Sequence, residues 1–142
     1  LNAFESFHWH FFVVLCIVII ALPNTMWIAN LMLANNICDL EEDRKNKRYT
    51  LVHYIGKKRA LSLFVTMNVI ALVSIGLSVI LNLAPLSVLL CYLIVPFIWQ
   101  QTKRFLQKQD KQETFICAVK ILAVGSTIQV LTYLVGLLIP LF

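Results

Sequence analysis

A polar stretch, NNICDLEEDRKNKRYTL at residues 35–51, contains residue types that bind metal ions and phosphate. If a helix runs through it, Asn35, Asp39 and Asp43 follow one another at i, i+4 and i+8 and therefore lie on one face. Like charges at this spacing repel one another unless a cation lies between them. Carboxylate and amide oxygens without His or Cys favour Mg²⁺ over Zn²⁺. The spacing therefore predicts a Mg²⁺ site formed by these three side chains.

Basic residues follow this acidic face directly. Mg²⁺ keeps coordination positions open for water and phosphate oxygens, and Arg44, Lys47 and Arg48 lie within two helical turns, where they can bind such a phosphate. The pattern predicts a metal-bridged diphosphate site. A plainer interpretation is that these charges only cap and solvate a helix end at the membrane surface. The adjacent amides of Asn35 and Asn36 argue against it, because polar groups at membrane depth are costly.

Long apolar segments surround the polar stretch. The chain has 142 residues, of which 60% are hydrophobic and 13% are charged, a composition outside the range of soluble globular domains. Segments of about 20 apolar residues span a bilayer core of about 30 Å, and four candidates are visible, at 11–34, 60–81, 86–101 and 114–138. The sequence therefore predicts an all-α membrane protein with four transmembrane helices.

Basic residues are confined almost entirely to two loops. Seven of the twelve Lys and Arg residues lie in 44–59 and four in 103–111, whereas residues 1–10 and 82–85 contain none. Because cytoplasmic loops carry an excess of Lys and Arg, both basic loops are expected in the cytoplasm, as four alternating crossings allow. The net charge of +5 then reflects topology and anionic lipid head groups. The lipid bilayer is the expected partner, and nucleic acid is not.

The segment NNICDLEEDRKNKRYTLVHYIG resembles the second aspartate-rich motif of the UbiA-type intramembrane aromatic prenyltransferases. That motif has the form N-x-x-x-D-x-x-x-D, followed by a basic loop, Thr-Leu and Gly. The paired Asn residues and the Thr-Leu end are most similar to the 1,4-dihydroxy-2-naphthoate branch of menaquinone biosynthesis. Lys47 stands where relatives commonly carry Gly. The residues that match the motif are Asn35, Asp39, Asp43, Thr50, Leu51 and Gly56.

The resemblance implies an all-helical membrane fold of nine spans, in which two such motifs bind polyprenyl diphosphate through Mg²⁺ on the cytoplasmic side. Residues 1–142 then correspond to the last four spans, and the N-terminal portion of the same enzyme is an expected partner. The implied activity is transfer of the polyprenyl group to an aromatic acceptor, 1,4-dihydroxy-2-naphthoate, in a bacterial plasma membrane. The alternative is a non-enzymatic four-helix membrane protein whose charged cytoplasmic loop binds lipid head groups or a partner.

Three further residues are candidates for the substrate pocket. Ile28 and Met32 lie on the helical arc of the predicted metal ligands, closer to the middle of the membrane. They line either an isoprenoid tunnel or an ordinary helix interface. His53 follows the motif and either meets a phosphate or the acceptor, or is a solvated loop histidine. Pro23 is expected to bend the first helix.

Overall fold

The structure, a computed structural model, describes residues 11–139. These residues form helices joined by short loops, with no β-strand among them. Four helical segments are long and apolar enough to cross a membrane, which makes the chain an all-helical integral membrane protein. In chain order the elements are α1 (Phe11–Cys38), α2 (Leu40–Lys45), α3 (Leu51–Ile55), α4 (Lys57–Ile80), η1 (Leu86–Ile94), α5 (Val95–Gln107) and α6 (Phe115–Leu138).

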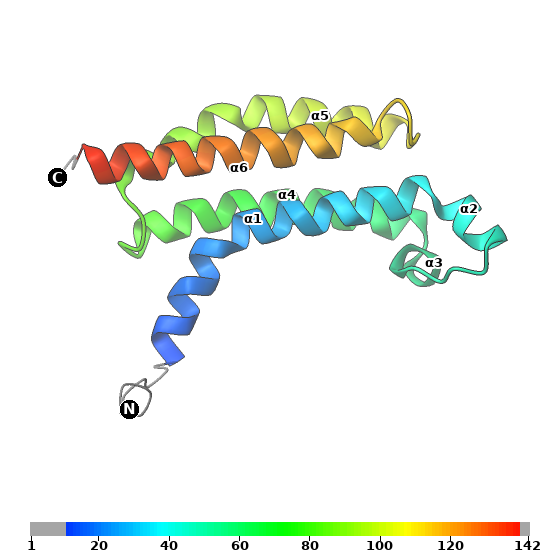
Figure 1. Cartoon of the computed structure of the whole chain (residues 1–142), viewed down its shortest axis with the longest axis horizontal. Helices are drawn as coiled ribbons and strands as arrows, with labels where there is room; N and C mark the ends of the chain where they lie inside the picture. Colours follow the sequence, from blue (N-terminus) through cyan, green and yellow to red (C-terminus); the bar gives the residue numbers. More distant parts are fainter. Residues whose placement is uncertain (1–10, 140–142) are drawn as a thin grey trace, which may run out of the picture.

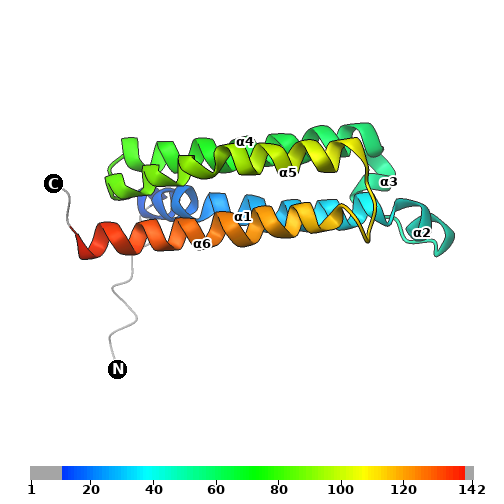
Figure 2. The ribbon, with the colours of Figure 1, turned by 90° about the horizontal axis from the view of Figure 1, so that it is seen from above.

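The four long segments run side by side as one elongated bundle (Figure 1). α1 packs against α4 and α6, while α6 also packs against η1 and α5. α2, α3 and the loop between α5 and α6 lie at one end of the bundle, and the turn between α4 and η1 lies at the other (Figure 2). The two basic loops that the sequence assigns to one membrane face therefore lie at the same end of the molecule.

The third span differs in shape from the others and extends beyond the predicted range of 86–101. It begins as the 3₁₀-helix η1 and continues as α5 to Gln107. A 3₁₀-helix is tighter than an α-helix, and nine residues is an uncommon length for one. Pro96 lies in the first turn of α5. Proline is tolerated there because the N–H groups of a first turn have no acceptor within the α-helix. The Ser87 hydroxyl donates to the Thr132 carbonyl at 2.7 Å and fixes η1 against α6.

α1 is bent, as the proline inside it predicts. Pro23 lacks the N–H that the helical ladder needs, and its ring crowds the preceding turn. The dark blue segment before the bend leans away from the bundle, whereas the rest of α1 runs along α4 (Figure 1). The helix then continues past the predicted end at residue 34 to Cys38, and so carries Asn35 to the end of the bundle.

The Trp27 side chain of α1 packs against Gly125 of α6 and fills the space between the two helices. It is only 1% exposed, and a Cβ atom added to Gly125 would lie 2.8 Å from the indole ring. Only a residue without a side chain lets the ring approach α6 this closely. Phe64 of α4 and Phe105 of α5 also stack, with ring centroids 4.7 Å apart. The first contact fixes α1, which leads into the polar stretch, against α6, and the second joins α4 to α5.

Two buried asparagines add hydrogen bonds between the helices. Asn30 Nδ2 in α1 donates to the Phe64 carbonyl in α4 at 2.9 Å. Asn68 Nδ2 in α4 donates to the Thr102 hydroxyl in α5 at 3.4 Å and to the Phe64 carbonyl at 3.3 Å. Bonds of this kind contribute about 0.6 kcal/mol each in a membrane interior. They hold α1, α4 and α5 in register close to the charged end of the bundle.

Candidate functional site

Asn35, Asp39 and Asp43 lie along one continuous helical face at the end of α1. The backbone N–H of Asp39 donates to the Asn35 carbonyl at 3.0 Å, and the N–H of Asp43 donates to the Asp39 carbonyl at 2.8 Å. These bonds continue the helical ladder across Asp39, the residue between α1 and α2. The three side chains therefore keep the i, i+4 and i+8 relationship on which the predicted Mg²⁺ site depends.

Lys111, from the loop between α5 and α6, is bonded to two of these side chains. Its ammonium nitrogen lies 2.6 Å from Asp39 Oδ2 and also donates to Asn35 Oδ1. The Asn35 amide nitrogen donates to the same Asp39 oxygen at 3.1 Å. The Asp39 side chain is 22% exposed and that of Lys111 46%, so the cluster is partly shielded from water. A positive charge thus lies where the amide and carboxylate oxygens converge.

Two of the three predicted ligands, Asn35 and Asp39, thus bring together oxygens of the kind that Mg²⁺ binds. Asn35 Oδ1 and Asp39 Oδ2 are hard oxygen donors close enough to bind one cation together. Asp43 follows one turn further on and is 8% exposed. Among residues 11–139, no group of three or more His, Cys, Asp or Glu side chains is placed to hold a metal ion by itself. A Mg²⁺ ion held here would therefore take its remaining ligands from phosphate, water or other protein segments.

The three predicted phosphate-binding residues lie at the turn after the acidic face. Arg44 forms an exposed ion pair with Glu41 at 3.0 Å. Lys47 and Arg48 are exposed, and the Arg48 N–H donates to the Asp43 carbonyl at 2.8 Å, which folds the turn back on α2. The turn therefore places three cations next to the motif, although the cation bonded to the motif itself comes from the other loop.

Lys47 has a left-handed backbone, with φ of +55°. An L residue with a side chain adopts this region at a cost of about 1 kcal/mol, whereas glycine adopts it freely. Relatives with this motif commonly carry Gly at this position, and the positive φ is the physical reason for that preference. Lys47 keeps the turn that glycine forms easily and adds a cation to it.

The loop between α5 and α6 is ordered by its own hydrogen bonds. Backbone N–H groups of Glu113 and Gln112 donate to Asp110 Oδ1 at 2.9 Å each, and these bonds hold the pKa of the Asp110 carboxyl below its usual value. The Asp110 N–H donates to Thr114 Oγ1 at 2.8 Å, just before α6. Lys108 pairs with Glu113 at 2.5 Å, and this hydrogen bond raises the pKa of Lys108. The loop therefore presents its remaining lysine to α1 from a fixed backbone.

Sequence reasoning did not single out Lys111 as a site residue. It lies 72 residues from Asp39 along the chain, and no local spacing links the two. The one signal that pointed to it was the distribution of basic residues, which placed both charged loops on the same membrane face.

The substrate-pocket candidates lie in α1 and α3. Ile28 and Met32 are 53% and 61% exposed, so the described helices leave their side of α1 open. The His53 ring packs edge-on against Tyr49, with centroids 4.8 Å apart, and against Tyr54, with centroids 5.4 Å apart. Its Nδ1 is buried without a hydrogen-bond partner in the described part of the chain. His53 is thus a partly buried histidine in an aromatic group, with one ring nitrogen uncommitted.

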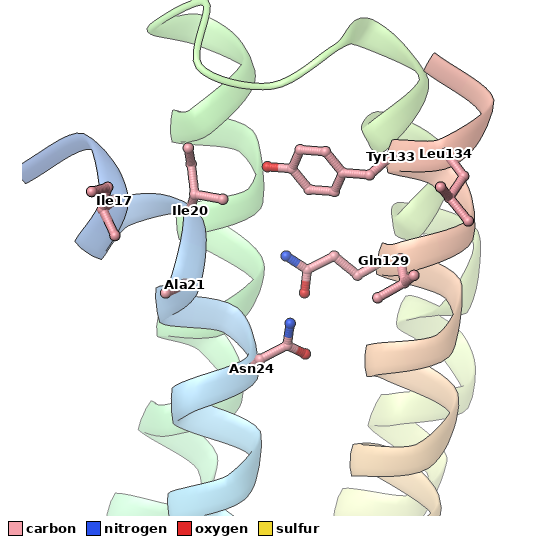
Figure 3. Close-up of a pocket in the computed structure, with 8 residues that line it drawn as sticks. Ile17, Ile20, Ala21, Asn24, Gln129, Tyr133 and Leu134 are labelled. Atoms are coloured by element: carbon pink, nitrogen blue, oxygen red, sulfur yellow. The ribbon is translucent and has the colours of Figure 1, made fainter. Parts of the chain in front are cut away.

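An open cavity of about 420 Å³ lies between α1 and α6, in the half of the bundle away from the charged loops (Figure 3). Its wall is mostly apolar, and the amide side chains of Asn24 and Gln129 point toward each other across it. Ile28 and Met32 are not part of this wall. At a rise of 1.5 Å per residue, Asn24 lies about 22 Å from Asp39 along α1. The cavity is therefore distinct from the charged site.

Fold and site together define an all-helical integral membrane protein with a polar face at one end of its bundle, where Asn35 and Asp39 bond to the Lys111 ammonium. Comparison with known proteins gives the family: residues 6–124 match the UbiA prenyltransferase family, and the chain belongs to it. A 1,4-dihydroxy-2-naphthoate octaprenyltransferase of Bacillus subtilis (strain 168) is 31% identical over 125 residues, which are 88% of this chain and 40% of the relative. The chain thus spans about 40% of the length of that relative. No solved structure matches this chain.

Proposed function

We propose that this chain forms the C-terminal portion of a Mg²⁺-dependent prenyltransferase that moves a polyprenyl group from its diphosphate to 1,4-dihydroxy-2-naphthoate. The observation that carries the proposal is the positive charge held jointly by Asn35 and Asp39 in a chain of the UbiA family. The acceptor, and with it a place in menaquinone biosynthesis, is supported by the name of the Bacillus subtilis relative. Family membership favours this enzyme over a non-enzymatic four-helix protein.

In this proposal the acidic face binds the metal. Asp39 and Asp43 each supply a carboxylate oxygen, and Asn35 binds either the metal or a diphosphate oxygen. Bound Mg²⁺ would neutralise negative charge on the leaving diphosphate. The helical ladder through Asp39 fixes the spacing of these ligands before substrate arrives, and ligands that are already positioned need no reorganisation during the reaction.

The basic turn would bind the diphosphate oxygens. Arg44, Lys47 and Arg48 would donate charge-assisted hydrogen bonds that strengthen as the carbon–oxygen bond breaks and its electron pair leaves with the diphosphate. The electron-rich acceptor ring would then attack the allylic carbon. The attacked ring carbon would regain aromaticity by losing the group that it carries, either its proton to water or its carboxylate as CO₂. Arg44 must first release Glu41, and because both side chains are exposed, that release costs less than about 1 kcal/mol. The reaction would also require that water, which would capture the allylic carbon, is excluded from the assembled site.

The acceptor is tested by incubating the full-length enzyme with Mg²⁺, a radiolabelled polyprenyl diphosphate and one aromatic acid at a time. Labelled product is expected with 1,4-dihydroxy-2-naphthoate and not with 4-hydroxybenzoate. Product with 4-hydroxybenzoate alone would overturn the acceptor and keep the reaction class. Release of diphosphate without any prenylated product would overturn the reaction class as well.

We propose that the membrane is a bacterial plasma membrane with both basic loops in the cytoplasm. Single cysteines replacing Lys45 and Lys108 should then react with a membrane-impermeant maleimide only in inverted vesicles, because both positions lie at the same end of the bundle. Every native cysteine of the protein is first replaced by serine or alanine, including Cys16, Cys38, Cys91 and Cys117. Labelling of either position in intact cells would reverse the orientation and move the charged site to the outer face.

The purified 142-residue chain is expected to catalyse no prenyl transfer by itself. Its described residues contain one acidic motif, which supplies only part of a metal coordination shell. Co-expression with the N-terminal portion of the same enzyme, on a separate plasmid, should restore transfer if the two parts assemble. Turnover by the 142-residue chain alone would show that one motif is sufficient and would contradict the two-motif proposal.

A further inference from the structure

The Lys111 ammonium lies where the proposed function would place a metal ion. Its ammonium nitrogen bonds to Asp39 Oδ2 at 2.6 Å and to Asn35 Oδ1, the two oxygens that would bind Mg²⁺ in the proposed function. A metal ion bound to the same two oxygens would lie directly beside the ammonium, and the two positive charges would repel each other strongly in this partly shielded cluster. Any metal ion that binds here must therefore displace Lys111.

The placement of Lys111 is built into the loop. Asp110 closes the turn by accepting hydrogen bonds from the N–H groups of Glu113 and Gln112. The other lysine of this loop, Lys108, is paired with Glu113 and does not compete for the acidic face. The Lys111 ammonium also lies 5.1 Å from the centre of the Phe115 ring at the start of α6, a distance typical of cation–π contacts. A displaced Lys111 thus stays attached, by an ordered loop, beside the motif.

We propose that Lys111 is an exchangeable counter-cation of the aspartate-rich face. In the metal-free protein it neutralises Asp39, and when Mg²⁺ and prenyl diphosphate bind, its ammonium transfers from the motif to a diphosphate oxygen. The inference rests on the proposed function, since it places the metal and diphosphate at this face. It adds a fourth cation, from the loop between α5 and α6, to Arg44 at the end of α2 and to Lys47 and Arg48 in the turn that follows.

The proposal predicts opposite effects on two ligands. Removing the ammonium abolishes the competition for Asp39 and Asn35, so a divalent metal alone should bind more tightly. A partly exposed ion pair of this kind corresponds to about a threefold to fivefold change in affinity. The same removal deletes a charge-assisted hydrogen bond to the diphosphate, so the metal–diphosphate complex should bind at least about tenfold more weakly. A purely structural role of Lys111 would weaken both.

The experiment compares full-length wild-type enzyme with its Lys111→Met variant in detergent. Mn²⁺, a paramagnetic substitute for Mg²⁺, is titrated alone and followed by electron paramagnetic resonance. A non-hydrolysable prenyl thiolodiphosphate is then titrated at saturating Mn²⁺. Lys108→Met is the matched control, since it removes a lysine from the same loop that is paired with Glu113 rather than with the motif. Lys111→Arg keeps the charge and should stay within about threefold of wild type for the thiolodiphosphate.

Tighter Mn²⁺ binding together with weaker thiolodiphosphate binding in Lys111→Met, and neither change in Lys108→Met, is the expected result. Unchanged or weaker Mn²⁺ binding in Lys111→Met would overturn the role of Lys111 as a counter-cation, even if wild type binds Mn²⁺ more tightly than Asp39→Asn, as the metal site itself requires. If wild type binds Mn²⁺ no better than Asp39→Asn, the proposed metal site itself has failed, and the exchange fails with it. Circular dichroism of each variant verifies that the helices are intact.

Discussion

Replacing Asp39 or Asp43 by asparagine in the full-length enzyme is expected to lower Mg²⁺-dependent prenyl transfer by about 10²-fold or more. That factor equals about 2.7 kcal/mol of lost transition-state stabilisation. Asparagine keeps the shape of the side chain and removes one negative charge, so one metal ligand is weakened while the helical ladder remains. Initial rates at several Mg²⁺ concentrations measure the loss, and in both variants the Mg²⁺ requirement should move to higher concentration.

Folding should survive both substitutions. Asp39 lies at the partly exposed edge of the bundle, where Asn35 and Lys111 are its side-chain partners. Asp43 is 8% exposed and forms no salt bridge in the described part of the chain. Removing the charge of a buried carboxylate without an ion-pair partner lowers its desolvation cost. The thermal unfolding temperatures should therefore stay close to that of wild type.

Glu41→Gln is the matched control for the two aspartate variants. Glu41 lies on the opposite face of the short helix, and its side chain is 77% exposed. Within residues 11–139 its one salt-bridge partner is the exposed Arg44. Losing that pair costs less than about 1 kcal/mol, so transfer should stay near the wild-type rate. If both aspartate variants were as active as Glu41→Gln and kept the same Mg²⁺ dependence, residues 35–51 would be a solvated helix end and the proposed function would be wrong.

Gly125→Val is expected to destabilise the full-length protein by about 1–3 kcal/mol, because the new side chain overpacks the contact between α1 and α6. A Cβ atom at this position already lies 2.8 Å from the Trp27 ring, and that ring is buried and cannot turn into solvent. SDS-induced unfolding in detergent micelles, followed by far-UV circular dichroism, measures the change. Ala123→Val is the control, since Ala123 is exposed on the same helix.

A double-mutant cycle identifies the cause. Trp27→Ala alone should cost about 3–5 kcal/mol through the cavity that it leaves. In the Trp27→Ala background, Gly125→Val should cost nothing or restore part of the stability, since the valine then fills space that the indole has left. A coupling energy of about 1 kcal/mol or more is expected. Additive losses would mean that α1 and α6 do not meet at these two residues.

The sequence was sufficient to predict the parts of the site that depend on local spacing. Asn35, Asp39 and Asp43 were expected on one face because they are four residues apart, and the backbone bonds across Asp39 confirm that geometry. The bend at Pro23 followed in the same way from the chemistry of a single residue. The clustering of both basic loops at one end followed from counting charges along the chain.

Features that depend on long-range packing could not be predicted. The bond from Lys111 to Asp39 joins residues far apart in the chain, and its loop owes its form to hydrogen bonds at Asp110 that no periodicity signals. The position of η1 depends on contacts with α6, such as the bond from Ser87 to Thr132, and nothing in its apolar sequence signals the 3₁₀ form. The pair between Arg44 and Glu41 could not be predicted either, because an exposed arginine side chain can adopt several rotamers and only some of them reach Glu41.

The most direct test of the metal–diphosphate site is a crystal structure of the full-length enzyme with Mn²⁺ and a prenyl thiolodiphosphate, using data collected at the manganese absorption edge. The proposed function predicts an anomalous difference peak about 2.0–2.3 Å from a carboxylate oxygen of Asp39 and of Asp43, with a diphosphate oxygen completing the shell. A manganese peak elsewhere, with Asp39 and Asp43 facing solvent and the diphosphate away from residues 35–48, would contradict it.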